Sequence, residues 1–483
     1  MVSATASAAE GGIAVPKPDP LFSPRYLAVT LGIISSVLLT AFEGLAVFTA
    51  LPVAVGAVHG TAYISLCFTA FTTASLVGMV VSGVRSDTAG PGLPFLGGTT
   101  VFGAGLLVAG AANSMAQLVA GRAIQGFGAG LVMVSVYVIV GRVYPDDMRA
   151  AVFAMMAALW VLPSVIGPLV AGTLTEKVSW RWVFLGVALL VPLPVALMAA
   201  PLRRMAGSGV AQGKDAAKLE AEAGRAVRAD SARWRQVRLA VAAAVGAGSL
   251  QYAGQDFTVV GIVLAVAGIA LLIPSVPKLL PTGTLRIARG LPAVIVMHGL
   301  LGGAFFGAEN YITTMLETER GLSPTVAGLT LIGVTASWMV ASQGMSREFL
   351  PWPREAMVRI GPFIVIAAIV VTGSAAVLPA PAVVVTAGMV IGGFGMGLVF
   401  PTLNLLLLRY SPQESQGTNS SAMQICDSLG GIALTGGTGA FFHVLHHPGT
   451  GNQGLYVLIF AILAAAAAAT AVIAPRVGAR AVV

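Results

Sequence analysis

Long apolar runs alternate with short polar or charged breaks along all 483 residues. Most runs are about 18 to 28 residues long, enough for a helix to cross the hydrocarbon core of a bilayer. The pattern predicts an all-α integral membrane protein. Fourteen runs are predicted as transmembrane helices: 27–55, 61–84, 93–112, 118–140, 150–174, 182–200, 239–253, 257–273, 291–315, 325–344, 360–378, 383–408, 422–444 and 455–473. The seventh is the shortest.

The basic residues orient these helices. An even number of crossings places both termini on one side, and all but four of the 27 Lys and Arg residues fall there. Arg122 lies within a run, and Lys177, Arg181 and Arg320 fall on the other side. Cytoplasmic loops carry the excess of Lys and Arg, so both termini are predicted to be cytoplasmic, in the plasma membrane. Twelve crossings would give the same orientation.

The composition excludes a soluble fold. Hydrophobic residues make up 57% of the chain, charged residues 10%, and the mean hydropathy is +0.89. A globular surface cannot be covered with so few polar groups. The net charge of +8 is explained by topology and anionic lipid, so no nucleic-acid partner is expected. Cys67 and Cys426 both fall inside apolar runs, and a disulfide is not indicated.

The chain divides into six parts. A cytoplasmic tail (1–24) precedes an N-terminal bundle of six helices (25–202) and a polar linker (203–237), which is expected to be flexible with at most one short amphipathic helix. Two accessory helices (238–280), a second six-helix bundle (290–475) and a cytoplasmic tail (476–483) follow.

The two bundles contain a repeat. The run GFGAG at 126–130 recurs as GFGMG at 393–397, and the same offset relates Pro145 to Pro412. It also carries Glu43 to within one residue of Glu309. Duplicated bundles of this kind place a substrate site near the bilayer midplane between the halves.

Three acids interrupt the apolar runs: Glu43, Glu309 and Asp427. A carboxylate at membrane depth costs about 2.5 to 3.5 kcal/mol, so it is normally kept to bind a proton, an ion or a substrate. Arg122 falls in the same half of the membrane as Glu43, because the first and fourth helices run in opposite directions. The two are predicted to couple for proton transfer, and a static structural pair is the alternative.

Three motifs carry a family resemblance. Residues 118–130 read LVAGRAIQGFGAG, residues 164–172 read SVIGPLVAG, and an acid, Glu43, precedes the Leu-Pro pair that ends at Pro52. In these motifs the chain resembles the fourteen-helix drug:proton antiporter branch of the major facilitator superfamily. The resemblance implies two six-helix bundles that alternate access, a proton-transfer role for Arg122, and a packing and hinge role for Gly167, Pro168 and Gly172.

The loop after the second helix departs from the family. It keeps Gly83, Asp87 and Gly90, but Thr88 and Pro91 stand where basic residues are usual. This predicts a gating motif with a weakened charge relay.

An amphipathic cavity is expected around Asp427, with aromatic walls for an apolar ligand and carboxylates for a cation. The alternative for its aromatic members is anchoring at the membrane interface. The residues assigned to the cavity are Asp427, Gln125, Trp160, Tyr311, Trp338 and Asn404.

These features predict a monomeric, proton-coupled secondary exporter of amphipathic small organic molecules, some of them cationic, with proton coupling at Glu43, Arg122 and Glu309. A dedicated metabolite or lipid permease is the alternative within transport. A membrane enzyme or sensor is more remote, since no nucleophile motif or nucleotide loop is found. No cofactor or metal is expected. His443, His446 and His447 are interpreted as a solvated loop, and His298 as a structural histidine.

Overall fold

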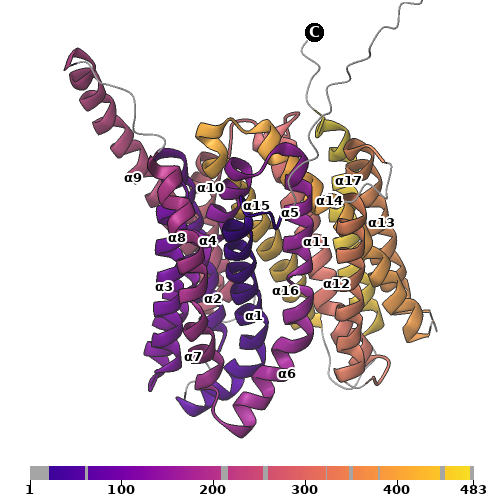
Figure 1. Ribbon diagram of the computed structural model, residues 1–483. Helices are drawn as coiled ribbons and strands as arrows, with labels where there is room; N and C mark the ends of the chain where they lie inside the picture. Colours follow the sequence, from indigo (N-terminus) through magenta and orange to yellow (C-terminus); the bar gives the residue numbers. More distant parts are fainter. Residues whose placement is uncertain are drawn as a thin grey trace, which may run out of the picture.

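The computed structural model describes residues 21–59, 64–207, 216–253, 259–322, 324–346, 352–378, 381–445 and 452–478. Nearly all of them are helical. The N-terminal half contains α1 (Leu27–Ala57), α2 (Ile64–Ala89), α3 (Gly92–Gly110), α4 (Met115–Val143), α5 (Asp146–Ala158), α6 (Val161–Lys177), α7 (Arg181–Leu190) and α8 (Pro192–Gly207). Figure 1 shows this half in indigo and magenta, beside the orange and yellow C-terminal half.

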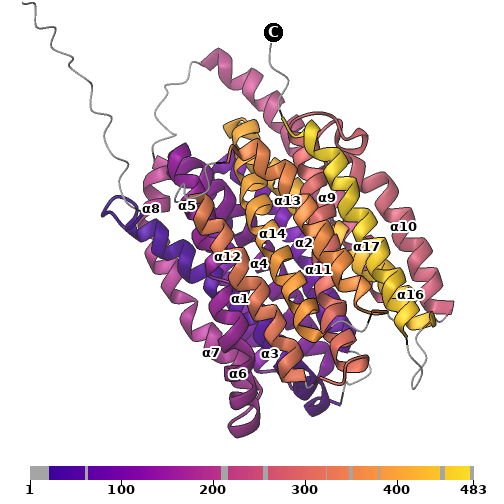
Figure 2. The same ribbon diagram turned by 90° about the vertical axis from the view of Figure 1, so that its right-hand side faces the viewer.

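Two helices, α9 (Ala216–Ala253) and α10 (Val259–Leu279), connect the halves. The C-terminal half contains α11 (Leu291–Thr318), α12 (Pro324–Ser346), α13 (Arg354–Ser374), α14 (Ala382–Tyr410), α15 (Gln416–Gly431), the π-helical η4 (Ile432–Gly436), α16 (Gly437–Leu445) and α17 (Gln453–Ile473). Short 3₁₀ turns are η2 (Thr284–Arg286), η3 (Gln413–Ser415) and η5 (Ala474–Arg476). The view in Figure 2 shows α10 and α17 running along one flank of the bundle.

Eleven helical stretches of the described residues are long and apolar enough to cross a membrane. The predicted crossings at 239–253, 325–344 and 422–444 are helical but do not belong to these eleven. The first is the end of the long α9, and the third is divided among α15, η4 and α16. Polar residues near the start of α15 lower its hydropathy, and this helix contacts α2 and α4 of the other half.

The linker segment is more ordered than its composition predicts. We expected an irregular loop with one short helix, whereas α9 begins at Ala216 and continues without a break to Ala253. Its first part projects beyond the bundle in Figure 1. Alanine, glutamate and arginine dominate this stretch, and all three are strong helix formers.

The fifth predicted crossing is interrupted between α5 and α6, at Leu159 and Trp160. Pro163 explains the position, because its ring nitrogen cannot donate to the Leu159 carbonyl four residues earlier. α6 continues through Gly167 and Pro168, the residues to which a packing and hinge role is assigned.

The internal repeat gives its two glycine runs equivalent neighbours. A Cβ on Gly126 would lie 2.0 Å from the Phe71 carbonyl oxygen in α2, and one on Gly393 would lie 2.4 Å from the Val334 carbonyl oxygen in α12. Two residues further on, Gly128 faces α3 and Gly395 faces α13 in the same way. Each run therefore lets its helix approach two neighbouring backbones closely, and α4 and α14 occupy corresponding places in the two halves.

Candidate functional site

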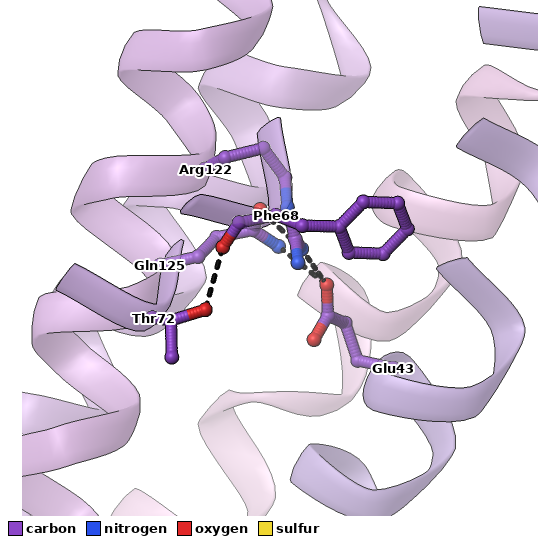
Figure 3. Close-up of polar contacts among 5 residues, drawn as sticks. All are labelled: Glu43, Phe68, Thr72, Arg122 and Gln125. Carbon is purple, nitrogen blue, oxygen red and sulfur yellow. Dashed lines mark hydrogen bonds and ion pairs between the residues drawn. The ribbon is translucent and has the colours of Figure 1, made fainter. Parts of the chain in front are cut away.

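A buried ion pair joins α1 to α4. The Arg122 Nη1 group donates to Glu43 Oε1, and the two side chains are 3% and 1% exposed. Glu43 lies 16 residues into α1, about 24 Å along the helix, so the pair is far from both ends of the span. The sequence analysis predicted that these residues would couple, and the structure brings them into direct contact (Figure 3).

Gln125 completes this polar cluster. Its Nε2 donates to Glu43 Oε1 at 3.2 Å, and its Oε1 accepts from Arg122 Nη1 at 3.1 Å. The guanidinium carbon of Arg122 also lies 4.4 Å from the centroid of the Phe71 ring in α2. Three helices thus hold the arginine through a carboxylate, an amide and an aromatic face. Gln125 was assigned to cargo binding, but these contacts place it beside the ion pair.

Two polar atoms of the cluster have no hydrogen-bond partner among the described residues: Glu43 Oε2 and Arg122 Nε. A buried atom without a partner carries a free-energy cost and is unusual in a stable pair. The free carboxylate oxygen leaves a place where a proton can attach without breaking the contact to Arg122. The cluster can therefore change its charge by one unit with little rearrangement.

The predicted packing motif lies directly behind Glu43. A Cβ on Gly167 of α6 would lie 3.6 Å from Leu45 Cβ, and one on Gly172 would lie 3.9 Å from Thr49 Cγ2. Both glycines therefore face α1, the helix that carries the acid. Pro168 is helical, and its side chain lies outside the described part of the structure.

The C-terminal half contains a group of aromatic side chains from α11, α12 and α14. The ring of Trp338 stacks on Phe306 with centroids 6.0 Å apart and meets Phe400 edge-on at 5.3 Å. Phe306 is 40% exposed, so the group is accessible from one side. Of its members only Trp338 was predicted as a cargo residue.

Asp427 of α15 lies next to this aromatic group. Its Oδ1 is 3.3 Å from Nδ1 of His298 in α11, and the ring of His298 lies on Phe400 with centroids 4.0 Å apart. Asn404 of α14 donates from Nδ2 to the Tyr137 hydroxyl of α4 at 3.4 Å, which joins the two halves of the protein. Asp427, Trp338 and Asn404 are thus brought to one region.

Three other predicted residues lie apart from that region. Glu309 is half-buried on α11, seven residues and about 10 Å beyond Gly302, the glycine that contacts Asp427. It makes no hydrogen bond or ion pair with the described part of the chain. The ring of Tyr311 packs on Phe442 at 5.7 Å, and Trp160 is exposed at the break between α5 and α6.

The two halves meet on the side of the bundle where α2 ends and α3 begins, called here the linker side. Asp87 accepts hydrogen bonds from the backbone N–H groups of Gly417 and Thr418 at 2.6 and 2.7 Å. Gly83 and Gly417 touch through their backbones, since a Cβ on Gly83 would lie 2.7 Å from the Gly417 carbonyl oxygen. Gly90 ends α2 with φ of +83°, a conformation that favours glycine.

The residues of the predicted gating motif thus contact the other half of the protein without the missing basic residues. Asp87 faces the N-terminus of α15, where free N–H groups and the helix dipole attract a carboxylate. Arg142 of α4 adds hydrogen bonds to the carbonyl oxygens of Ser86 and Gln413, at 2.9 and 3.4 Å. Sequence reasoning missed Arg142, and its position near the end of a span was the only signal.

Among the described residues no group of three His, Cys, Asp or Glu side chains is placed to hold a metal ion. His446 and His447 lie outside the described residues, as does the side chain of His443.

The fold and the buried charges define a multi-pass membrane transporter. Residues 32–435 match the Major Facilitator Superfamily, and the chain belongs to that family. Solved structures agree on the fold. The human organic anion transporter MFSD10 (TETRAN) superposes with a TM-score of 0.62 at 14% identity, over 93% of this chain and all of that one. The proton:xylose symporter XylE gives 0.63 at 13% identity, over 91% of this chain and 94% of that one.

Sequence relatives include bacterial transporters. The chain is 26% identical to the multidrug transporter protein MdtP of Bacillus subtilis, over 85% of this chain and 74% of MdtP. It is 25% identical to an uncharacterized MFS-type transporter, Rv1877, of Mycobacterium tuberculosis, over 88% of this chain. That match spans 60% of the mycobacterial protein, less than two thirds of its length. A shorter match, 32% identical over 156 residues, is to multidrug resistance protein 3 of Bacillus subtilis; it covers 32% of this chain and 30% of that protein.

Proposed function

We propose that this transporter is a proton-coupled secondary exporter of amphipathic small organic molecules, including cationic ones. The observation that carries the proposal is the buried cluster of Glu43, Arg122 and Gln125, in which one carboxylate oxygen has no partner. A group that can gain or lose a proton at this depth links the proton gradient to the arrangement of three helices.

The charge of the cluster changes sharply on protonation. With Glu43 ionised the pair with Arg122 is neutral, and with Glu43 protonated an uncompensated guanidinium charge remains in an apolar surrounding. The Phe71 ring and the Gln125 carbonyl then remain as the partners of Arg122. Proton binding thus favours any helix arrangement that gives the arginine more water, and this difference drives the conformational change.

The cargo site is assigned to the C-terminal half. Phe306, Trp338 and Phe400 provide an apolar wall, and Asp427, 28% exposed, provides negative charge beside it. An aromatic wall with one carboxylate suits an amphipathic cation, through apolar contact, cation–π attraction and charge. Two relatives named for multidrug transport support this class of cargo.

Export is inferred from the antiporter-like motif at residues 164–172. The contacts of Asp87 and Gly417 close the linker side, and the excess of basic residues on that side makes it cytoplasmic. A cytoplasm-closed state is the one from which cargo leaves outward and a proton enters from outside. The proposed cycle protonates Glu43, or Glu309, from the outside and returns that proton to the cytoplasm after the halves rock.

A lipid permease is the second candidate, and one observation favours it. A groove of about 730 Å³ lies between the accessory helices and the segment from the end of α15 to the start of α16. Its walls are almost entirely apolar and include Leu250, Ile273, Leu429 and Ile432. A transport panel with cationic dyes, neutral drugs and labelled phospholipids separates the two candidates.

The test of proton coupling uses the purified protein in liposomes with an imposed pH gradient. Glu43→Gln keeps the shape and the contact to Arg122 but cannot titrate, so we expect gradient-driven cargo transport to fall to background. Glu43→Asp keeps a carboxyl group and should retain part of the transport. Gly44→Ala is the matched control, because a Cβ at Gly44 meets open space. Normal gradient-driven transport by Glu43→Gln would exclude coupling at this acid.

A further inference from the structure

His298 is buried in the membrane-spanning part of the C-terminal half, next to the carboxylate assigned to cargo. The residue is 2% exposed, and neither ring nitrogen has a hydrogen-bond partner among the described residues. Its Nδ1 nevertheless lies 3.3 Å from Asp427 Oδ1. Burying an imidazole with two unsatisfied nitrogens costs free energy, so such a residue is expected to have a role in another protonation state. Protonation makes both ring nitrogens hydrogen-bond donors.

The fold prevents the two side chains from separating. A Cβ on Gly299 would lie 2.3 Å from the Cys426 carbonyl oxygen, and one on Gly302 would lie 2.6 Å from Asp427 Oδ1. The backbones of α11 and α15 are in direct contact beside the pair, since a Cβ on Gly303 would also lie 2.4 Å from the Gly430 carbonyl oxygen. Phe400 covers the other face of the imidazole, which holds the ring in place.

No other charged group competes for the imidazole within the described residues. The titratable neighbours are Asp427 and Cys426 from α15 and Tyr137 from α4. Trp338 of α12 and Phe400 and Asn404 of α14 also lie in this region, and none of these three side chains titrates near neutral pH. The charged residues of α13, namely Arg354, Glu355 and Arg359, are exposed at the linker side. On α11 itself Glu309 lies 11 residues away, about 16 Å along the helix.

We propose that His298 is a specificity-determining residue that sets the charge available at the cargo site. With a proton on His298, the imidazolium neutralises Asp427 and the site rejects cations. When that proton leaves, Asp427 is free to bind the positive group of the cargo. Binding one monovalent cation therefore displaces one proton, and the net charge of the site stays constant. The cargo class rests on the function proposed above, whereas the pairing of His298 with Asp427 does not.

This proton is separate from the one on Glu43. Asp427 lies 11 residues into α15, about 16 Å from its linker-side end, whereas Glu43 lies about 24 Å from the linker-side end of α1. One proton site thus belongs to the N-terminal half and drives the conformational change. The other belongs to the C-terminal half and selects cargo by charge.

The first experiment measures proton release on binding of tetraphenylphosphonium, by calorimetry in buffers of different ionisation enthalpy. The reference is the double variant Glu43→Gln, Glu309→Gln, which removes both acids assigned to proton coupling. At about pH 6 the reference should release close to one proton per bound cation, because the imidazolium paired with Asp427 must lose its proton before the cation can bind. His298→Asn should release none and should bind about tenfold more tightly than the reference. At about pH 8 the two affinities should agree.

His59→Asn is the matched histidine control. His59 is exposed with φ of +58°, a conformation that asparagine tolerates, so this variant should behave as the reference. Equal proton release from the reference and His298→Asn overturns the inference. A neutral ligand should bind equally well to all variants at both pH values.

The second experiment needs no cargo. In the Glu43→Gln protein with the other four histidines replaced, ¹⁵N resonances of the single imidazole report its charge. At about pH 5.5 we expect an imidazolium in the reference and a neutral ring after Asp427→Asn, because the carboxylate is what holds the proton. A neutral ring in the reference overturns the pairing. If the pairing holds but tetraphenylphosphonium does not bind, the proposed cargo class is wrong and the pairing stands.

Discussion

Asp87 of α2 holds Thr418 of α15 by two hydrogen bonds, from the backbone N–H at 2.7 Å and from the side-chain hydroxyl at 2.6 Å. These bonds join one residue from each half of the transporter on the linker side. The carboxylate sits at the start of a helix, where its charge is favoured by the free N–H groups. This contact can form only while the two halves are together on that side.

Asp87→Asn should open the linker side. The amide keeps one acceptor but loses the charge, and charged hydrogen bonds contribute about 1.5 to 3 kcal/mol each, so the closed state should lose on the order of tenfold in population. Maleimide labelling of Ser421→Cys, a position that is 4% exposed in the closed interface, measures this in a background without Cys67 and Cys426. Asp147→Asn, an exposed acid on the same side, is the control. Unchanged labelling would remove Asp87 from the gate.

Gly83→Ala should prevent full closure. Its new Cβ would lie 2.7 Å from the Gly417 carbonyl oxygen and 2.8 Å from Ser421 Cβ, and overpacking of this kind costs about 1 to 3 kcal/mol. We expect normal insertion, faster labelling at position 421 and slower transport. Gly97→Ala meets open space and should transport normally. Equal transport by both variants would show that the glycine contact is not needed.

Arg122→Lys should lose most proton-driven transport. Lysine keeps a charge near Glu43 but cannot also reach Gln125 and lie flat on Phe71 as the guanidinium does. We expect transport to fall about tenfold or more and its pH profile to change, measured as cargo flux in liposomes at several pH values. Arg85→Lys, at an exposed position, should have no effect. An unchanged pH profile would indicate a structural pair only.

Asp427→Asn and Glu309→Gln should weaken cationic cargo and spare neutral cargo of similar size. Removing a carboxylate removes a Coulomb partner in a medium of low dielectric constant, so we expect about a tenfold loss for cations. The loss should be larger at Asp427, which lies beside the aromatic wall, than at Glu309, which lies about 10 Å further along α11. Counterflow at equal pH measures both. Equal losses for cations and neutral molecules would indicate coupling or folding instead.

Local features of the sequence were sufficient for much of the fold. The length of each apolar run predicts a helix, because a backbone in lipid must satisfy its hydrogen bonds within the segment. The repeated glycine runs predicted two related halves, and the structure gives them equivalent neighbours. The contact between Glu43 and Arg122 also followed, since each charge lies well inside an apolar run and the two fall in the same half of the membrane.

Only the tertiary structure decided which side chains meet across helices. Sequence gives the depth of a residue in the membrane, but the rotation of a helix and its neighbours depend on packing over the whole bundle. For that reason Gln125 joins Glu43, and His298 pairs with Asp427 although they are 129 positions apart in the chain. Asp87 likewise finds its partner at the start of α15, 331 positions away. The sequence by itself predicted most of the spans and the charges within them, whereas close packing at glycines decided which of those charges share a site.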